Sequence, residues 1–300
     1  MMNRKTILVT GSAGFIGKAC IRTWKEKYRV VGIDNLVGTR SFAPPEGEYE
    51  FYNEDVRNIK LLPLPKIDAV VHLAAQTAVT LSESSPIADY TNNIEATMRL
   101  IERYKDLPFI YSSTNKVYGE LEGVRKPIGL SHPIDPKTPY GVTKASADLL
   151  IQELVPRSIC LRQSCIYGEQ QDGTEDQGWV SHLLKQHRSG GNFTVFGDGN
   201  QVRDLLHVDD LLTLYSSYLT SLLKGWQPKQ KYFVVGGGVK NAITVNEALE
   251  YVGFSGKVTF EKKRNKDQDY FVSANENLGW VQYVNAKKWL CEAGSKSKKI

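Results

Sequence analysis

The sequence predicts an α/β protein built on a doubly wound, mostly parallel sheet. Three observations support this fold class. Strand-like and helix-like segments alternate along the chain, apolar residues make up 41% of its 300 residues, and the first strand runs into a glycine-rich turn. Alternation of this kind favours a parallel sheet with helices on both faces. The length is sufficient for one large domain or two modest ones.

The first elements predict a dinucleotide site. Residues 5–9, which contain the apolar run 7–9, are typical of a buried strand, and residues 15–25 are expected to form the next helix. Glycines in the turn between them would permit unusual backbone dihedrals and close approach of a phosphate. The helix N-terminus would present free N–H groups and a positive dipole end. We expect cofactor contacts from Gly11, Ala13, Gly14, Phe15, Ile16 and Gly17.

A second strand, residues 29–33, ends at Asp34, followed by Asn35. An acidic residue about 20 positions beyond such a turn is expected to bind the hydroxyls of the adenosine ribose. Its charge would repel a 2′-phosphate, which favours NAD over NADP, although the nearby Arg40 leaves the 2′-phosphate open. Both Asp34 and Asn35 are predicted cofactor residues.

Two later strand ends are expected to border the same cofactor. Asp55 and Val56 follow the strand-like residues 49–52 and are predicted to meet the adenine, while residues 69–75 read as one apolar strand that ends in small residues. His72 within that strand is interpreted as a packed residue rather than a catalyst. Further cofactor contacts are expected from Leu73, Ala74, Ala75, Asn93 and Ser112.

The chemistry is predicted at the end of another apolar strand, residues 109–114. Ligands of open parallel sheets bind at the carboxyl ends of the strands, so Thr114 should face the substrate. Tyr140 and Lys144 are four residues apart and would share one side of a helix. A free tyrosine has a pKa near 10, which a neighbouring ammonium would lower. Tyr140 could then take a hydroxyl proton while hydride leaves the carbon.

Together these residues resemble the extended short-chain dehydrogenase/reductases, in their nucleotide-sugar epimerase and dehydratase group, from Lys5 to about Trp289. Val117-Tyr118-Gly119 and Gln201-Val-Arg203-Asp204 extend the resemblance. It implies a Rossmann-like NAD-binding domain, mainly residues 1–167, and a smaller mixed α/β region, mainly residues 168–300, that binds a nucleoside-diphosphate sugar. The boundary is approximate because the chain is expected to cross between the two.

The resemblance also assigns roles within the site. Thr114, Tyr140 and Lys144 would be catalytic, and Lys144 would also hold the nicotinamide ribose. Guanidinium groups suit the diphosphate because they pair bidentately with phosphate oxygens. The implied substrate residues are Gln76, Thr114, Asn115, Lys116, Cys165, Gln177, Gly178, Trp179, Val180, Gln201, Arg203, Arg264 and Asp267.

One pair of residues separates branches of this group. Sugar dehydratases of the family typically carry Asp-Glu after the strand-end threonine, whereas this chain has Asn115-Lys116. An amide cannot serve as the acid and an ammonium is a poor base, so epimerisation is favoured over dehydration. The block 175–179 is similar to enzymes that invert carbon 2 of a CDP-sugar such as CDP-paratose or CDP-tyvelose. A UDP-sugar 4-epimerase of the UDP-glucose type and a non-catalytic NAD-binding scaffold remain alternatives.

Composition narrows the possible partners. The net charge of +5 gathers towards the C-terminus, so neither a nucleic acid nor a membrane partner is predicted. The four cysteines form no Cys-x-x-Cys pair, so no metal is expected. No signal peptide or apolar run of about 18 residues is seen, which predicts the cytoplasm. The resemblance further implies a homodimer formed through helices around 89–104 and 140–154.

Overall fold

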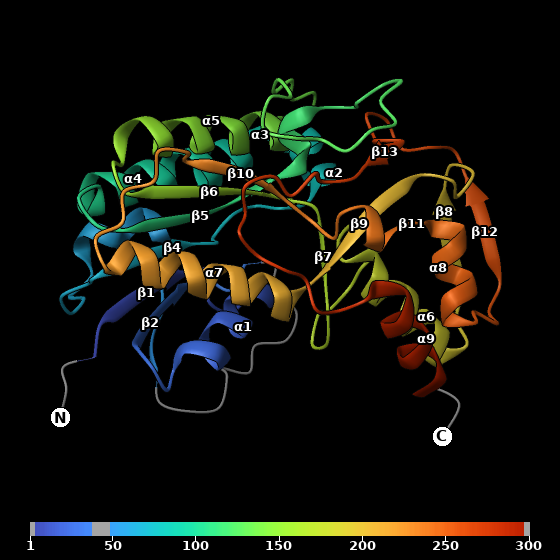
Figure 1. The fold of residues 1–300 in the computed structure, drawn as a ribbon, viewed down its shortest axis with the longest axis horizontal. Helices are drawn as coiled ribbons and strands as arrows, with labels where there is room; N and C mark the ends of the chain where they lie inside the picture. The colour runs from blue at the N-terminus through green and yellow to red at the C-terminus, as the bar shows by residue number, and fades with distance from the viewer. Residues whose placement is uncertain (1–3, 38–48, 297–300) are drawn as a thin grey trace. The chain divides into compact units, whose positions relative to one another are not determined.

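The computed structural model describes residues 4–37 and 49–296, which fall into two compact units (Figure 1). The first, called the sheet unit, comprises Met1–Thr114, Pro139–Leu161 and Leu212–Phe233, and the second unit comprises Asn115–Thr138, Arg162–Leu211 and Val234–Ile300. The chain therefore enters each unit three times, and a single boundary after residue 167 stays an approximation.

A seven-stranded sheet with helices on its faces confirms the predicted doubly wound fold. The strands are β1 (Thr6–Thr10), β2 (Arg29–Asp34), β3 (Glu50–Asn53), β4 (Ala69–His72), β5 (Phe109–Thr114), β6 (Ser158–Gln163) and β10 (Tyr232–Val235). Their order is β10-β6-β5-β4-β1-β2-β3, and β1 pairs in parallel with both β2 and β4. The chain thus turns from one half of the sheet to the other beside β1, where sheets of this kind bind ligands.

Helices cover both faces of the sheet in Figure 1, with α1 (Phe15–Trp24) and α7 (Val208–Leu223) on one face and α4 (Ala96–Tyr104) and α5 (Pro139–Leu154) on the other. The apolar strands are buried in between, and Leu8 of β1 and Val70 of β4 belong to the same core as Leu100 and Ile151. The indole N–H of Trp24 donates to the hydroxyl of Ser216 at 2.8 Å, which fastens α1 to α7.

Short elements connect these layers. They are the 3₁₀ helices η1 (Val56–Leu61) and η3 (Asn115–Tyr118), the helices α2 (Val79–Ser84) and α3 (Pro86–Asp89), and the π-helix η2 (Tyr90–Glu95). The helix expected around 89–104 is therefore divided, because the π turn precedes α4. The strand expected over 69–75 ends at His72, since the N–H groups of Leu73 and Ala74 turn to the hydroxyl of Thr10.

The second unit has its own core around a small mixed sheet. β7 (Cys165–Tyr167), β11 (Ala242–Thr244) and β13 (Tyr270–Phe271) all pair with β9 (Val202–His207), while β8 (Phe193–Phe196) pairs with β12 (Val258–Glu261). The helical elements are α6 (Trp179–Ser189), η4 (Val239–Asn241), α8 (Val245–Val252) and α9 (Ala286–Ser295). Across the described ranges, no helix is long and apolar enough to cross a membrane.

A buried carboxylate ties the strands of this unit together. Asp204 of β9 is fully buried, and its Oδ2 accepts hydrogen bonds from the N–H of Ser273 at 2.9 Å, the hydroxyl of Ser273 at 2.6 Å and the N–H of Gly238 at 2.9 Å. The hydroxyl of Ser164 donates to Oδ1. One side chain therefore satisfies donors from three separate chain segments.

Candidate functional site

The glycine turn after β1 is too tight for any side chain at its key positions. Gly11 has φ +69°, and a Cβ there would lie 2.7 Å from the N atom of Ala74. A Cβ on Gly17 would lie 2.2 Å from the carbonyl oxygen of Gly11. Gly14 is the N-cap of α1 and supplies no side-chain cap, so the helix N-terminus keeps its capacity to bind an anion. Phe15 and Ile16 form the first helical turn.

Asp34, at the end of β2, lies beside this turn. Its Oδ2 accepts the N–H of Ala13 at 3.0 Å, and its Oδ1 accepts the N–H of Leu36 at 2.8 Å. A carboxylate has about four lone-pair positions. Each oxygen of Asp34 thus retains capacity for a ribose hydroxyl, and the site fits an adenosine without a 2′-phosphate. Arg40 lies outside the described residues.

The loop after β4 is held by side chains of its own unit. Asn93 of the π-helix accepts the N–H of Gln76 at 2.9 Å and donates to the hydroxyl of Thr143 on α5 at 3.0 Å. The amide nitrogen of Gln76 donates to the carbonyl of Ala78 and to Asp89, and its oxygen accepts the N–H of Ala78. Gln76, predicted to contact substrate, is therefore engaged within the sheet unit.

The predicted catalytic trio comes together in the sheet unit. Tyr140 and Lys144 are buried on successive turns of α5, and the Tyr140 side chain is hydrogen-bonded to Thr114 at the end of β5. The ammonium of Lys144 donates to the carbonyl of Ser112 at 2.6 Å and lies 4.2 Å from the ring centre of Tyr111. Two hydrogen-bonded hydroxyl groups and an ammonium group are thus gathered near the end of β5.

Burial sets the protonation of these groups. It raises the pKa of Tyr140 to about 12, against a hydrogen bond from Thr114 that lowers it. It lowers the pKa of Lys144 to about 7, against the negative charge of Asp148, which raises it. The lysine therefore titrates near neutral pH, whereas the tyrosine needs additional positive charge to act as a base.

Sequence reasoning did not single out Asp148, which lies one turn beyond Lys144. The hydroxyl of Ser113 donates to its Oδ2 at 2.6 Å, so the side chain is fixed under β5. The sequence did contain a signal for this residue: Asp148 lies four residues after Lys144, as Lys144 lies four after Tyr140, so all three share one helix face. His72 is packed, as interpreted: its ring nitrogens contact the hydroxyls of Thr10 and Thr97 at 2.7 and 2.9 Å.

In the second unit, two predicted cations share one predicted carboxylate. Oδ1 of Asp267 accepts the ammonium of Lys116 at 3.0 Å and the guanidinium of Arg203 at 3.0 Å. The two positive charges hold the pKa of Asp267 well below its usual range despite its burial. The side chain of Cys165 is hydrogen-bonded to Trp179, and burial raises the pKa of its thiol.

The remaining substrate candidates are more scattered within that unit. Arg264 donates to the carbonyl of Glu175 at 3.0 Å, and its guanidinium lies 4.0 Å from the ring centre of Phe196. The side-chain amide of Gln201 donates to the backbone carbonyl of Phe196 at 3.1 Å. Asn115 donates to Gln268, a partner that sequence reasoning missed. Gln177 is exposed in a turn, Gly178 is the N-cap of α6 with φ +66°, and Val180 is only 2% exposed in the core.

The part of the chain that holds the glycine turn and the predicted catalytic trio matches a known protein family. Residues 7–236 match the model of the NAD-dependent epimerase/dehydratase family. The chain belongs to this family and is an NAD-dependent enzyme of the nucleotide-sugar epimerase class. The predictions of NAD and of an extended short-chain dehydrogenase/reductase are thereby confirmed.

Individual relatives cover nearly the whole chain. It is 30% identical to the CDP-paratose 2-epimerase of Salmonella typhi, over 94% of this chain and 96% of that one. It is 31% identical to a putative UDP-glucose 4-epimerase of Methanocaldococcus jannaschii, over 94% and 95% of the two chains. A crystal structure of UDP-glucose 4-epimerase with UDP-glucose from Thermotoga maritima superposes with a TM-score of 0.84 at 27% identity, covering 98% and 99%. These relatives differ in the sugar and nucleotide that they are named for.

Proposed function

We propose that this enzyme inverts carbon 2 of a CDP-sugar, such as CDP-paratose or CDP-tyvelose, by transient oxidation to a ketone and re-reduction. The observation that carries the proposal is the hydrogen-bonded pair of Tyr140 and Thr114 with Lys144 on the next turn. The resemblance of residues 175–179 and the relative from Salmonella typhi support the choice of carbon and nucleotide.

The protein groups would handle the proton of this reaction. Thr114 orients the sugar hydroxyl, and Tyr140 takes its proton during oxidation and returns it during reduction. When bound, oxidised NAD supplies a hydride acceptor and a positive charge. A protonated Lys144 on the next turn would favour the phenolate of Tyr140, since a nearby cation stabilises an anion. Asp148 favours the protonated lysine, because its charge opposes the effect of burial.

The residues after Thr114 support epimerisation over dehydration. Asn115 is paired with Gln268, and the ammonium of Lys116 is held by Asp267 at 3.0 Å. Neither side chain offers the carboxylic acid that loss of a sugar hydroxyl needs. The shared contact with Asp267 instead puts the charge of Lys116 beside that of Arg203, an arrangement suited to a diphosphate.

The test is to incubate purified protein separately with CDP-paratose and UDP-glucose and to follow epimer formation by NMR. We expect the carbon 2 epimer of the CDP-sugar, with Tyr140→Phe retaining NAD but losing turnover. Equal turnover in that variant would remove Tyr140 from the mechanism. Inversion of the UDP-sugar alone would favour the second candidate, a UDP-sugar 4-epimerase, which the relative from Methanocaldococcus jannaschii supports. No turnover of either would favour an NAD-binding scaffold.

The proposal includes a homodimer. Apolar side chains are exposed on adjacent elements of the sheet unit: Ile87 on α3, Tyr90 on the π-helix, and Val142 and Leu149 on α5 are 72%, 52%, 45% and 49% exposed. Burying such a patch against a second copy would remove apolar area from water. Light scattering of the wild type should give the dimer mass, and a monomer at micromolar concentration would refute it.

A cytoplasmic location also belongs to the proposal, because free, fully buried thiols such as Cys20 suit a reducing compartment.

A further inference from the structure

The ammonium of Lys144 lies against the face of a buried aromatic ring. Its Nζ is 4.2 Å from the ring centre of Tyr111, a residue of β5 that is only 1% exposed. The same Nζ donates to the carbonyl of the following residue, Ser112, at 2.6 Å. The negative face of an aromatic ring attracts a cation within about 6 Å of its centre, and more strongly where both groups are withdrawn from water. One strand therefore supplies a ring face and a carbonyl to this ammonium.

The hydroxyl of Tyr111 plays no part in this contact. Its oxygen is buried and has no hydrogen-bond partner among the residues that the structure describes. Burial and the negative charge of Asp148 hold the pKa of this phenol well above its ordinary range, so the ring carries no charge. A buried hydroxyl without a partner costs free energy of folding. The useful part of this side chain is therefore its ring.

Burial works against the charge of Lys144 and lowers its pKa to about 7. Groups on the surrounding elements oppose this effect: the carboxylate of Asp148 on α5, the thiol of Cys160 on β6 and the carboxylate of Asp89 on α3. His72 on β4 also faces the ammonium, but burial above all lowers the pKa of its imidazole to about 3, so this ring is neutral at pH 7. The positive charge of Lys144 near neutral pH therefore depends on what surrounds it.

The carboxylate of Asp89 acts on Lys144 from beyond hydrogen-bond distance. Its side chain is fully buried at the end of α3. Oδ1 accepts the amide of Gln76, and Oδ2 has no hydrogen-bond partner within the described part of the chain. Neither oxygen reaches the ammonium, which instead contacts the carbonyl of Ser112 and the ring of Tyr111.

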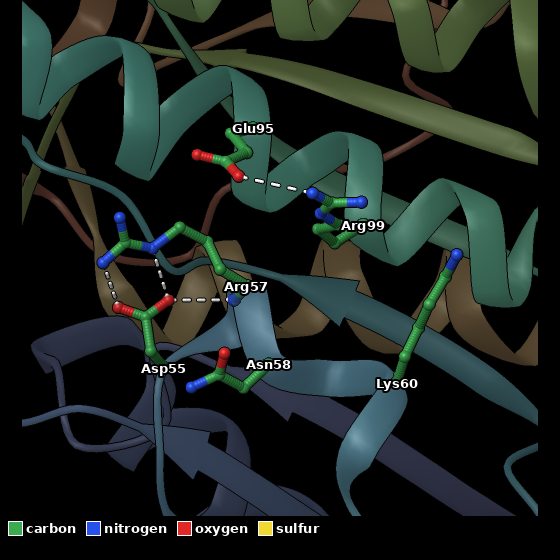
Figure 2. A pocket seen from close by; sticks show the side chains of 6 residues that line it. All are labelled: Asp55, Arg57, Asn58, Lys60, Glu95 and Arg99. Atoms are coloured by element: carbon green, nitrogen blue, oxygen red, sulfur yellow. Dashed lines mark hydrogen bonds and ion pairs between the residues drawn. The ribbon is translucent and has the colours of Figure 1, made fainter.

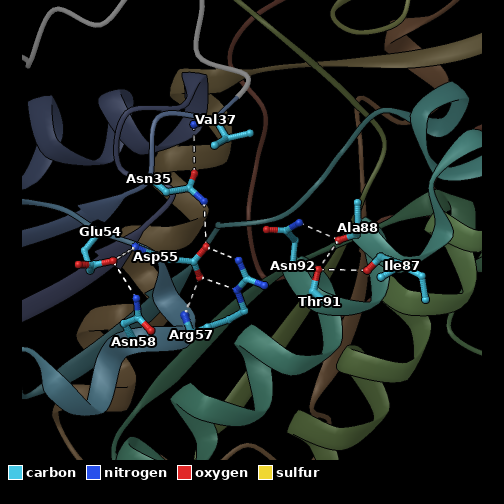
Figure 3. Close-up of polar contacts among 10 residues, drawn as sticks. All are labelled: Asn35, Val37, Glu54, Asp55, Arg57, Asn58, Ile87, Ala88, Thr91 and Asn92. Atoms are coloured by element: carbon cyan, nitrogen blue, oxygen red, sulfur yellow. Dashed lines mark hydrogen bonds and ion pairs between the residues drawn. The ribbon is translucent and has the colours of Figure 1, made fainter.

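The position of Asp89 is fixed by the π turn that follows it. The amide of Asn92 donates to the carbonyl of Ala88 at 2.7 Å (Figure 3). At the other end of the π-helix, Glu95 pairs with Arg99 at 3.5 Å on the wall of a polar hollow of about 350 Å³ (Figure 2). Because these contacts hold both ends of the turn, the carboxylate is kept at its distance from the ammonium.

We propose that Tyr111 is a positioning residue whose ring face holds the ammonium of Lys144 and keeps it protonated near neutral pH. The sheet unit thereby retains a cation one helical turn from Tyr140, where it would favour the phenolate. The inference about protonation stands on the contact between α5 and β5, and its benefit to turnover rests on the proposed function.

The test follows the ionisation of Lys144 itself by NMR. Full-length protein saturated with NAD is enriched in ¹³C at the lysine Cε, and the signal that is lost in Lys144→Met is followed against pH. The attraction of a buried ring face should be lost in Tyr111→Leu, so this variant should lower the pKa of Lys144 by about one unit. Tyr111→Phe loses only the unpartnered hydroxyl and should leave the pKa within about 0.3 unit. An unchanged pKa in Tyr111→Leu, or an equal fall in Tyr111→Phe, would overturn the proposal.

Phe109→Leu is the matched control. Phe109 lies two residues earlier on the same strand, is buried in the same core, and has its ring centre 6.1 Å from that of His72. Its replacement should leave the pKa of Lys144 unchanged. A fall as large as that in Tyr111→Leu would show that lost packing, rather than lost attraction to the ring, moves the pKa, and the proposal would then be wrong.

A second measurement covers the case in which Tyr111→Leu does not fold. A trifluorinated phenylalanine in place of Tyr111 keeps the shape of the ring but weakens its negative face, so the pKa of Lys144 should fall relative to Tyr111→Phe. An equal pKa would contradict the proposal. None of these values needs turnover, so absence of epimerisation with the expected pKa values would count against the proposed function alone. Turnover with an unchanged pKa would count against this inference alone.

Discussion

Asp204 offers the sharpest test of what holds the second unit together. Replacing it with alanine removes the acceptor of two N–H groups, from Ser273 and Gly238. It also removes one acceptor of two hydroxyls, but the hydroxyl of Ser164 still reaches the carbonyl of residue 204 at 2.9 Å, and that of Ser273 still reaches Asn275 at 3.1 Å. Hydrogen bonds to charged groups contribute about 1.5–3 kcal/mol each, but the losses within one network are not additive. A buried donor left unsatisfied costs about 1–3 kcal/mol, and two N–H groups lose their acceptor, so we expect Asp204→Ala to lower the free energy of unfolding by about 4 kcal/mol.

Urea unfolding followed by circular dichroism measures this loss. Asp204→Asn keeps one acceptor oxygen in the same volume, so it should cost about half as much. The matched control is Asp135→Ala in the same unit, where a carboxylate with 65% of its side chain exposed pairs with Lys137 at 2.8 Å. An exposed pair contributes about 0–1 kcal/mol. A cost below about 1 kcal/mol for Asp204→Ala, no larger than that of the control, would refute the reasoning.

The remaining predictions concern the sheet unit. Gly17→Ala should reduce the NAD released on denaturation by about tenfold or more, because the new Cβ would lie 2.2 Å from the Gly11 carbonyl oxygen; undiminished NAD would contradict this. Burial lowers the pKa of Lys144 to about 7, whereas a lysine in the unfolded chain has a pKa near 10.4. Between these two values the unfolded chain binds more protons than the folded one, so the free energy of unfolding should rise with pH by up to about 1.4 kcal/mol per unit. Lys144→Met should flatten this rise in urea unfolding at pH 7, 8 and 9, and equal slopes would refute the shift. Asp34→Ala should relax the preference for NAD over NADP in binding assays; an unchanged preference would make Asp34 structural.

The sequence was most informative where backbone geometry dictates residue type. Only glycine fits at residues 11 and 17, and the centre of the buried strand β1 is the apolar run 7–9. The spacing of Tyr140 and Lys144 could be converted into a helix face because helical periodicity is fixed. These local rules were sufficient for the fold class and for placing Thr114, Tyr140 and Lys144 together in the sheet unit.

The sequence was least informative about which hydrogen-bond partner a polar side chain has when several groups are within reach. Gln76 stays a predicted substrate residue and Asp55 a predicted adenine residue, but the sequence did not show their protein partners, which are Asp89 for Gln76 and Arg57 with Asn35 for Asp55. Such choices depend on distances between segments remote in sequence, which periodicity does not encode. The π turn before α4 has the same origin, since it places Asn93 against the loop after β4.

The pairing of Trp24 with Ser216 has a consequence for synthesis on the ribosome. The first helix of the chain is made early, but Ser216, which accepts the indole N–H of Trp24, follows 192 residues later. This contact between α1 and α7 therefore cannot form until most of the chain has been translated. The strand at one edge of the sheet, β10, is made later still. Chaperones that shield early apolar helices should accordingly raise the yield of this enzyme more than slower translation of its first half would.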